Sequence, residues 1–248
     1  MRHFNSFCCV LLALLAWAPI HADRLKLMTY NIHHAEGMDK VYSPERIAKV
    51  IMEDSPDVVA LQEVDSVSRR VNGHYVAGDI AKLTDMVATY AEAIPLQGGK
   101  YGVALLSKQA PQSVRRIPLP GQEEKRVILI ADFGKYVVCC THLSLTEGDR
   151  INSIPIIRRA LKKYKRKPIF IMGDFNDTPS SVFMQKFARH FQALTSKSVP
   201  TFPYNQPREV IDYIMTRQGT GQPRAIRSHI TIGNIASDHC PLMTEVEY

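Results

Sequence analysis

Acidic, amide and imidazole side chains stand at the ends of short apolar runs throughout this 248-residue chain. Five of them share this placement: Asn31 after LKLMTY, Glu63 after VVALQ, His142 after VVCCT, Asp174 after PIFIMG, and Asp212 inside VIDYIM. Taken singly, each is at least as well explained by a solvated strand end or by a structural histidine. Taken together, side chains that end strands at one edge of a sheet would form a cluster over a rigid base, which suits metal-assisted hydrolysis.

Two local motifs carry a more specific signal. Gly173-Asp174-Phe175-Asn176 places a carboxylate and a carboxamide two residues apart in a predicted tight turn, so both can face one pocket while Phe175 packs away from it. Ser237-Asp238-His239 places an acid next to an imidazole, directly before a final apolar run. A carboxylate beside a histidine can hold its tautomer and raise its basicity, as a water-activating base requires.

The elements that must position these side chains alternate along the chain, which predicts strands and helices in packed layers. The apolar runs predicted as strands are 25–30, 58–61, 103–106, 127–131, 136–141, 168–172, 210–215 and 242–246. A helix is predicted to begin at the cap Ser43 and Pro44, and further helices over 79–90, 149–164 and 180–190. Without a repeat or a linker-like composition break, one domain is predicted over 23–248.

Composition and targeting signals narrow the class of protein. With 45% hydrophobic and 22% charged residues, the chain is ordinary globular protein and neither disordered nor a multi-pass membrane protein. Residues 1–22 have the pattern of a cleaved signal peptide: a short basic start, an apolar run over 7–18, and small Ala22 before the expected cut. We therefore expect a secreted or periplasmic protein. An uncleaved anchor is the less favoured alternative, because the run is shorter than the ~20 residues that span a bilayer.

The net charge of +7 includes a dense basic segment, with seven Lys or Arg among the ten positions 158–167. Such a run at a predicted helix end usually complements the helix dipole in solvent, and an anionic partner, nucleic acid or an acidic lipid surface, is the alternative. Past the signal segment, Cys139, Cys140 and Cys240 form an odd set, so buried thiols are favoured over a disulfide framework.

The motifs, in their order, resemble those of the exonuclease-endonuclease-phosphatase superfamily over nearly all of the predicted mature chain. The segments that carry the resemblance are Thr29-Tyr30-Asn31-Ile32, Leu61-Gln62-Glu63-Val64, Tyr101-Gly102, Leu105-Leu106-Ser107, Thr141-His142-Leu143, Gly173-Asp174-Phe175-Asn176, Ile211-Asp212-Tyr213-Ile214 and Ser237-Asp238-His239. The resemblance implies an α/β fold, a four-layer sandwich of two mixed β-sheets flanked by helices, and a metal-dependent phosphoesterase. The chain departs from the family at Val103, where many members have Asn, and at Cys240.

The resemblance also implies a metal site and a general base. It makes Glu63 the principal ligand of Mg²⁺ or Mn²⁺, with Asn31 and Asp238 as further ligands, direct or through water. Hard oxygen ligands are what these cations prefer. His239, polarised by Asp238, would take the proton of the attacking water, and Asp174 is the alternative proton acceptor.

Further roles follow from the same resemblance. Asp174 and Asn176 would orient the water and stabilise the oxygens on phosphorus. His142 would stabilise charge or protonate the leaving oxygen, and Asp212 would orient His142. Tyr101 would bind substrate. Fixed donors and cations are needed because charge develops on the phosphorus and on the leaving oxygen.

The favoured function is therefore a secreted, Mg²⁺- or Mn²⁺-dependent hydrolase of a small or lipid-linked phosphodiester. The predicted mature chain is near the minimal length for such a fold and has no recognisable DNA-gripping insertion. A non-specific secreted nuclease is one alternative. An inactive binding module of the same fold is another, and it is disfavoured because every expected catalytic position is filled. No obligate protein partner is evident.

Overall fold

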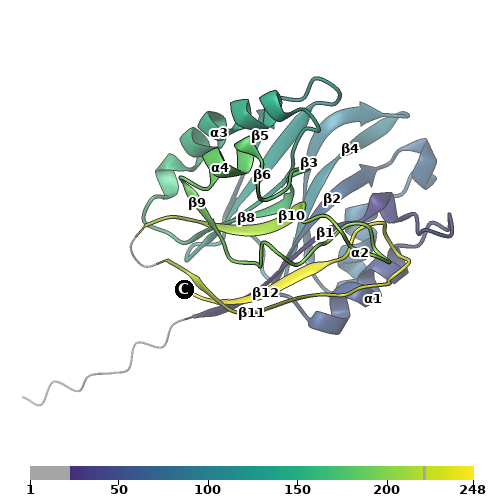
Figure 1. Cartoon of the computed structure of the whole chain (residues 1–248). Helices are drawn as coiled ribbons and strands as arrows, with labels where there is room; N and C mark the ends of the chain where they lie inside the picture. Colours follow the sequence, from purple (N-terminus) through teal and green to yellow (C-terminus); the bar gives the residue numbers. More distant parts are fainter. Residues whose placement is uncertain (1–22, 220–221) are drawn as a thin grey trace, which may run out of the picture.

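The fold is built from two mixed β-sheets that pack face to face (Figure 1). It was obtained as a computed structural model, which describes residues 23–219 and 222–248. The predicted signal peptide, 1–22, lies outside the described residues. No helix among the described residues is both long and apolar enough to cross a membrane.

Each sheet has six strands. The first has the order β11 (Arg224–Ile230), β12 (Leu242–Glu247), β1 (Arg24–Asn31), β2 (Val58–Ser66), β4 (Gly99–Ser107), β3 (Val87–Leu96). The second has the order β5 (Ser113–Leu119), β6 (Arg126–Asp132), β7 (Val137–His142), β8 (Ile169–Asp174), β10 (Asp212–Arg217), β9 (Phe191–Ala193). In each sheet one pair is parallel, β1 with β2 and β7 with β8, and the other pairs are antiparallel.

Helices cover the outer face of each sheet, so the predicted four-layer sandwich is confirmed (Figure 1). The α-helices are α1 (Pro44–Asp54), α2 (Val76–Thr84), α3 (Glu147–Leu161) and α4 (Val182–Phe187), and the short 3-10 helices are η1 (His33–Ala35), η2 (Arg69–Val71) and η3 (Lys162–Tyr164). Buried side chains of α1 and α2 form one core with the first sheet, and those of α3 and α4 form another with the second. A third core lies between the sheets.

Successive side chains of a strand point to opposite faces of its sheet, so neighbouring residues of one strand belong to different cores. In β1, Met28 and Tyr30 join the core under α1 and α2, whereas Leu27 joins the core between the sheets. The adjacent Cys139 and Cys140 likewise point into different cores. Both thiols and that of Cys240 are free and buried, as the odd count predicted.

Local signals account for most of the boundaries. Helix α1 begins as predicted: Ser43 caps it by accepting a hydrogen bond from the Arg46 amide, and Pro44 follows. The helix predicted over 79–90 is found as α2, but its predicted end is wrong, because α2 ends at Thr84 and the chain enters strand β3 at Val87. Asp85, in the left-handed conformation, terminates the helix.

The topology brings the chemistry-bearing residues to one end of the sandwich. Asn31 ends β1, while His142 and Asp174 end the parallel strands β7 and β8 and lie opposite each other in register. Strand β10 runs antiparallel to β8, so its first residue, Asp212, pairs with Asp174. The strand-end pattern in the sequence therefore becomes a spatial cluster.

Candidate active site

Asn31 lies at the centre of the cluster and connects residues from both sheets. Its side-chain Nδ2 is 3.1 Å from Glu63 Oε1 on β2 and 3.1 Å from Asp174 Oδ2 on β8, and 3.5 Å from His239 Nε2. Its Oδ1 accepts a hydrogen bond from the His33 amide, which fixes which way the carboxamide points. The fully buried Asn31 thus places a neutral donor between two carboxylates.

Glu63 reaches the cluster because its strand is bulged. The pairing of β2 with β4 changes register between Leu61 and Val64, and Glu63 itself has φ 57°. A positive φ is strained for a residue with a side chain, and bulges commonly re-aim a side chain next to a functional site. Leu61 and Val64 are both buried under the helices, while Glu63 is only partly buried at the strand interruption.

The hydrogen-bond partner of His239 is Asp212, whose Oδ2 is 2.9 Å from His239 Nδ1, whereas Asp212 was expected to orient His142. Asp238, which was expected to polarise His239, acts on it through charge and not through a hydrogen bond. Asp238 instead accepts a hydrogen bond from Ser237 Oγ at 3.3 Å. The pairing follows from β10 lying beside β8, which places Asp212 at the site with its carboxylate directed toward the His239 ring.

The two histidines of the cluster experience opposite electrostatic environments. Burial lowers the pKa of His142 to about 4, and the attraction of Asp174 only partly opposes this. For His239, burial also acts to lower the pKa, but the carboxylates of Asp212, Asp174 and Asp238 outweigh it and raise the pKa to about 10. Each ring has its Nε2 3.6 Å from Asp174 Oδ2, so both imidazoles approach the same Asp174 oxygen.

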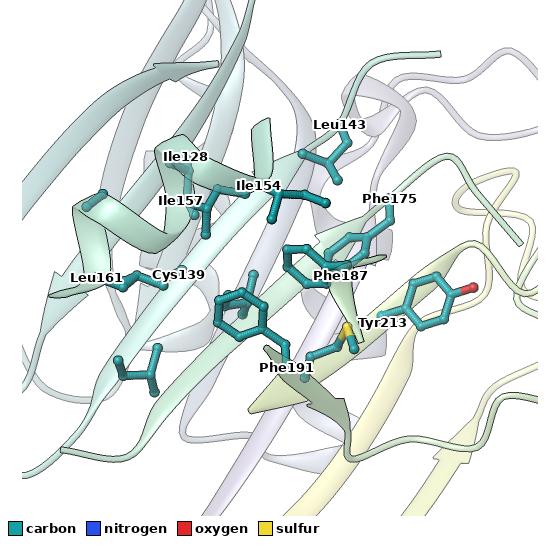
Figure 2. Close-up of a cluster of buried hydrophobic side chains, with 14 of the residues drawn as sticks. Ile128, Cys139, Leu143, Ile154, Ile157, Leu161, Phe175, Phe187, Phe191 and Tyr213 are labelled. Atoms are coloured by element: carbon teal, nitrogen blue, oxygen red, sulfur yellow. The ribbon is translucent and has the colours of Figure 1, made fainter. Parts of the chain in front are cut away.

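The Gly173-Asp174-Phe175-Asn176 turn behaves as its sequence predicts. The Asn176 amide donates to Asp174 Oδ1 at 2.8 Å, and the Asn176 side chain donates to the Leu143 carbonyl at 2.9 Å. These bonds fix the turn against the end of β7. Figure 2 shows Phe175 in the aromatic core beside Phe187. The side-chain nitrogen of Asn176 thus contacts the Leu143 carbonyl, and the role of Asn176 in orienting the attacking water stays a prediction.

Tyr101 lies beside the cluster, in a small recess that His142 and Arg126 also line. Its ring is buried under the Arg70 guanidinium, which is 5.4 Å from the ring centroid, and burial raises the pKa of its hydroxyl. Sequence analysis missed Arg126, which is 6% exposed and paired with Glu123 and Glu124 at 3.3 and 3.1 Å. A cation at the start of the otherwise apolar run RVILIA is the signal that could have identified it.

The residues present fit a divalent cation. One ligand atom from each of Asp174, Asp212 and His239 lies within 4.8 Å of the others. Asp212 Oδ1 is buried and has no hydrogen-bond partner within the described part of the chain. Burial and the charge of Asp212 raise the pKa of Asp174, which marks a concentration of negative charge. A buried carboxylate oxygen without a partner is costly, and a hard cation would relieve that cost. Glu63 supplies a further oxygen next to this group, held by the side-chain Nδ2 of Asn31, which also donates to Asp174.

The sequence and fold are similar to those of known proteins. The sequence model of the Endonuclease/Exonuclease/phosphatase family matches residues 28–239. Exodeoxyribonuclease III of Haemophilus influenzae is 27% identical over 173 residues, which are 64% of this chain and 60% of that protein. The chain thus spans less than two thirds of that relative.

Two solved structures illustrate the likeness in fold. An endonuclease/exonuclease/phosphatase from Beutenbergia cavernae has a TM-score of 0.73 and 23% identity, covering 90% of this chain and 71% of that one. The mannosyl-6-phosphatase Bt3783 of Bacteroides thetaiotaomicron has a TM-score of 0.67 and 14% identity, covering 90% and 100%. At these identities the likeness concerns the fold alone.

Proposed function

The chain belongs to the Endonuclease/Exonuclease/phosphatase family, and from this premise we propose that it is a secreted, divalent-cation-dependent hydrolase of a small or lipid-linked phosphodiester. Members of the family hydrolyse phosphoester bonds. The observation that carries the proposal is the convergence of Asn31, Glu63, Asp174, Asp212 and His239 at one end of the two sheets. Export rests on the predicted signal peptide, 1–22.

The family resemblance assigns the cation to Glu63, Asn31 and Asp238, and the structure brings ligand atoms of Asp174, Asp212 and His239 together next to Asn31. When bound, Mg²⁺ or Mn²⁺ supplies positive charge to the phosphoryl oxygens. The chain's own residues orient the reacting groups and move the proton. Asp212 accepts the Nδ1 hydrogen of His239, and this contact directs Nε2 toward Asp174 and Asn31. Asp174, or His239 in its neutral form, then takes the proton of the attacking water.

His142 lies on the other side of Asp174 and is the donor for a phosphoryl or leaving oxygen. Its ring is buried, and its Nδ1 has no partner within the described residues. A preorganised donor of this kind contributes most where charge develops in the transition state. The Asn176 turn holds Asp174 and the end of β7 together, which keeps the distance between His142 and His239 fixed.

The preference for a small or lipid-linked diester rests on where the basic residues lie. The dense basic segment 158–167 covers the end of α3 and the residues after it, at the end of the second sheet that is away from the site, so it does not adjoin His239. A nuclease is the second candidate, and the 27% identity to exodeoxyribonuclease III favours it.

A substrate screen tests the proposal. The purified protein, first stripped with EDTA, is assayed with and without Mg²⁺ or Mn²⁺ on bis-(4-nitrophenyl) phosphate, 4-nitrophenyl phosphate, phospholipid vesicles and plasmid DNA. We expect metal-dependent turnover of diesters and little cleavage of plasmid. Faster cleavage of plasmid would establish the nuclease, and the absence of turnover on every substrate would establish a binding module.

A matched pair of variants ties the activity to the site. His239→Ala should lose about 10²-fold or more in turnover, the usual effect of removing a group that moves a proton. His190→Ala, at the other end of the second sheet, should retain the activity of the unmodified protein.

A further inference from the structure

A second pocket lies at the end of the second sheet that is remote from the active site. It has a volume of about 580 Å³ and is lined by the end of α3, the segment after α4 and the end of β10. Six cations line it: Arg158, Arg159, Lys162, Lys165, Arg189 and Arg217. No carboxylate is among its lining residues. Three separate segments of the chain therefore direct positive charge into one volume.

The pocket is separate from the hydrolytic cluster. Strand β10 begins with Asp212 in the cluster and ends with Arg217 in the pocket. Five residue steps along a strand correspond to about 17 Å. A ligand in this pocket would therefore not touch His239 or Asp174.

The positive charge of the pocket is not compensated. Within the described residues, none of the six cations forms an ion pair with a carboxylate, although 14 ion pairs of Lys or Arg with a carboxylate occur elsewhere in that part of the chain. Arg217 donates only to the Lys165 carbonyl, and burial lowers the pKa of its guanidinium with no acid nearby to raise it. Burial, Arg158 and Arg189 all lower the pKa of His190, another lining residue.

The helix dipole explains only part of this arrangement. Arg158 lies in the last turn of α3 and Lys162 and Lys165 follow it, where cations complement the exposed carbonyls. Arg189 and Arg217 come from other segments and add like charges to the same pocket. Like charges gathered without counter-charge repel one another, and a bound anion would remove that repulsion.

We propose that this pocket is a second, non-catalytic site for a ligand carrying at least two phosphate charges. Arginine guanidinium groups match phosphate oxygens in pairs, and lysines add point charges around them. The volume lies within the range of small-molecule sites. Because the cations converge on one pocket from three segments, a compact phosphorylated group fits better than a duplex, which presents its phosphates along an extended surface. The group could come from a soluble phosphate or from a lipid headgroup.

Titration calorimetry with inorganic pyrophosphate tests the site. EDTA is included, so that no divalent cation can hold the anion in the hydrolytic cluster. The triple variant Arg158→Gln, Lys162→Gln, Arg189→Gln should bind at least about tenfold more weakly than the unmodified protein. The matched control is Lys49→Gln, Lys82→Gln, Lys197→Gln, which removes the same charge from exposed positions elsewhere and should bind as the unmodified protein does. Both variants should hydrolyse bis-(4-nitrophenyl) phosphate at the unmodified rate.

Sedimentation with vesicles distinguishes the two sources. A lipid headgroup would be identified by two results together. The protein would bind phosphatidylcholine vesicles that contain phosphatidic acid but not vesicles of pure phosphatidylcholine, and the triple variant would lose this binding. Binding of pyrophosphate alone would identify a soluble ligand. If the triple variant does not fold, the single exposed change Lys162→Glu replaces it. Equal binding by variant and unmodified protein, no binding of either phosphate probe, or pocket-dependent binding of duplex DNA only would overturn the proposal.

Discussion

A single methyl group at Gly173 should force apart the two strands that carry His142 and Asp174. Gly173 lies opposite Thr141 in the parallel pairing of β7 with β8. A Cβ atom at this position would meet the Thr141 carbonyl oxygen far inside the 3.0 Å below which such contacts essentially do not occur. The atom it meets is backbone, which has no alternative rotamer. The strands must therefore separate by on the order of 1 Å, because the surrounding core is close-packed.

This displacement has a structural and a catalytic consequence. Overfilling a packed core costs about 1–3 kcal/mol. We place Gly173→Ala in the upper part of that range because the atoms that the new methyl group meets are all backbone atoms of Thr141. Asp174 Oδ2 is 3.1 Å from Asn31 Nδ2 and 3.6 Å from both imidazoles. A shift of about 1 Å takes the first contact beyond hydrogen-bonding range, and a misplacement of that size commonly costs about 10²-fold in rate.

Urea denaturation and steady-state turnover of bis-(4-nitrophenyl) phosphate measure the two effects separately. Gly148→Ala is the matched control, because a Cβ there has no atom within 4 Å and Gly148 lies in the first turn of α3. It should leave turnover unchanged and stabilise the protein by up to about 1 kcal/mol. Unimpaired turnover and stability in Gly173→Ala would refute the close approach of β7 and β8 on which the geometry of the site depends.

Three further changes test the core, the site and the electrostatics. Phe175→Ala, in the aromatic core of Figure 2, should lower the free energy of unfolding by about 3–5 kcal/mol in urea denaturation. Asp212→Asn and His239→Ala should each reduce turnover. The double variant should be little worse than His239→Ala, because the two side chains act as a unit. Losses that multiply in the double variant would show that the two residues have separate roles. Burial opposes ionisation of Glu123, but backbone and Ser144 hydrogen bonds and Arg126 outweigh it and lower its pKa to about 2. The stabilisation that the ionised Glu123 carboxylate contributes is therefore complete above pH 4.5, the ordinary pKa of a glutamate, and is lost as the pH falls through about 2. The deficit of Glu123→Gln in urea denaturation should accordingly be about 1–2 kcal/mol at pH 7, allowing for solvent screening, and vanish near pH 2; a deficit independent of pH would contradict the assignment.

The interior of the fold was predictable from sequence, whereas its edges were not. Every one of the eight predicted strands overlaps an observed strand, since buried strands are continuous apolar runs. The four strands that were missed, β3, β5, β9 and β11, are the outer strands of the two sheets. Edge strands are half exposed and carry charges, as in SVRRIPL of β5 and RAIRSHI of β11, so the apolar pattern is interrupted.

The active site also has a part that could be predicted from the sequence and a part that could not. Strand ends that stop at one sheet edge could be expected to converge, and Asn31, Asp174 and His142 do so. The pairing of Asp212 with His239 could not be read from the sequence, because it depends on β10 lying antiparallel beside β8. The remote pocket also depends on tertiary structure, since Arg189 and Arg217 become neighbours of the basic segment only after folding.

Turnover of bis-(4-nitrophenyl) phosphate as a function of Mg²⁺ concentration tests most directly whether the cluster is a metal-dependent hydrolytic centre. EDTA should abolish turnover of the unmodified protein. Glu63→Gln loses the charge that would hold a hard cation, so its half-saturating Mg²⁺ concentration should rise by about tenfold or more, with partial recovery at high Mg²⁺. Glu53→Gln, an exposed glutamate on α1, should behave as the unmodified protein. Full turnover in EDTA, or a Mg²⁺ dependence that Glu63→Gln leaves unchanged, would contradict a metal-dependent centre at Glu63.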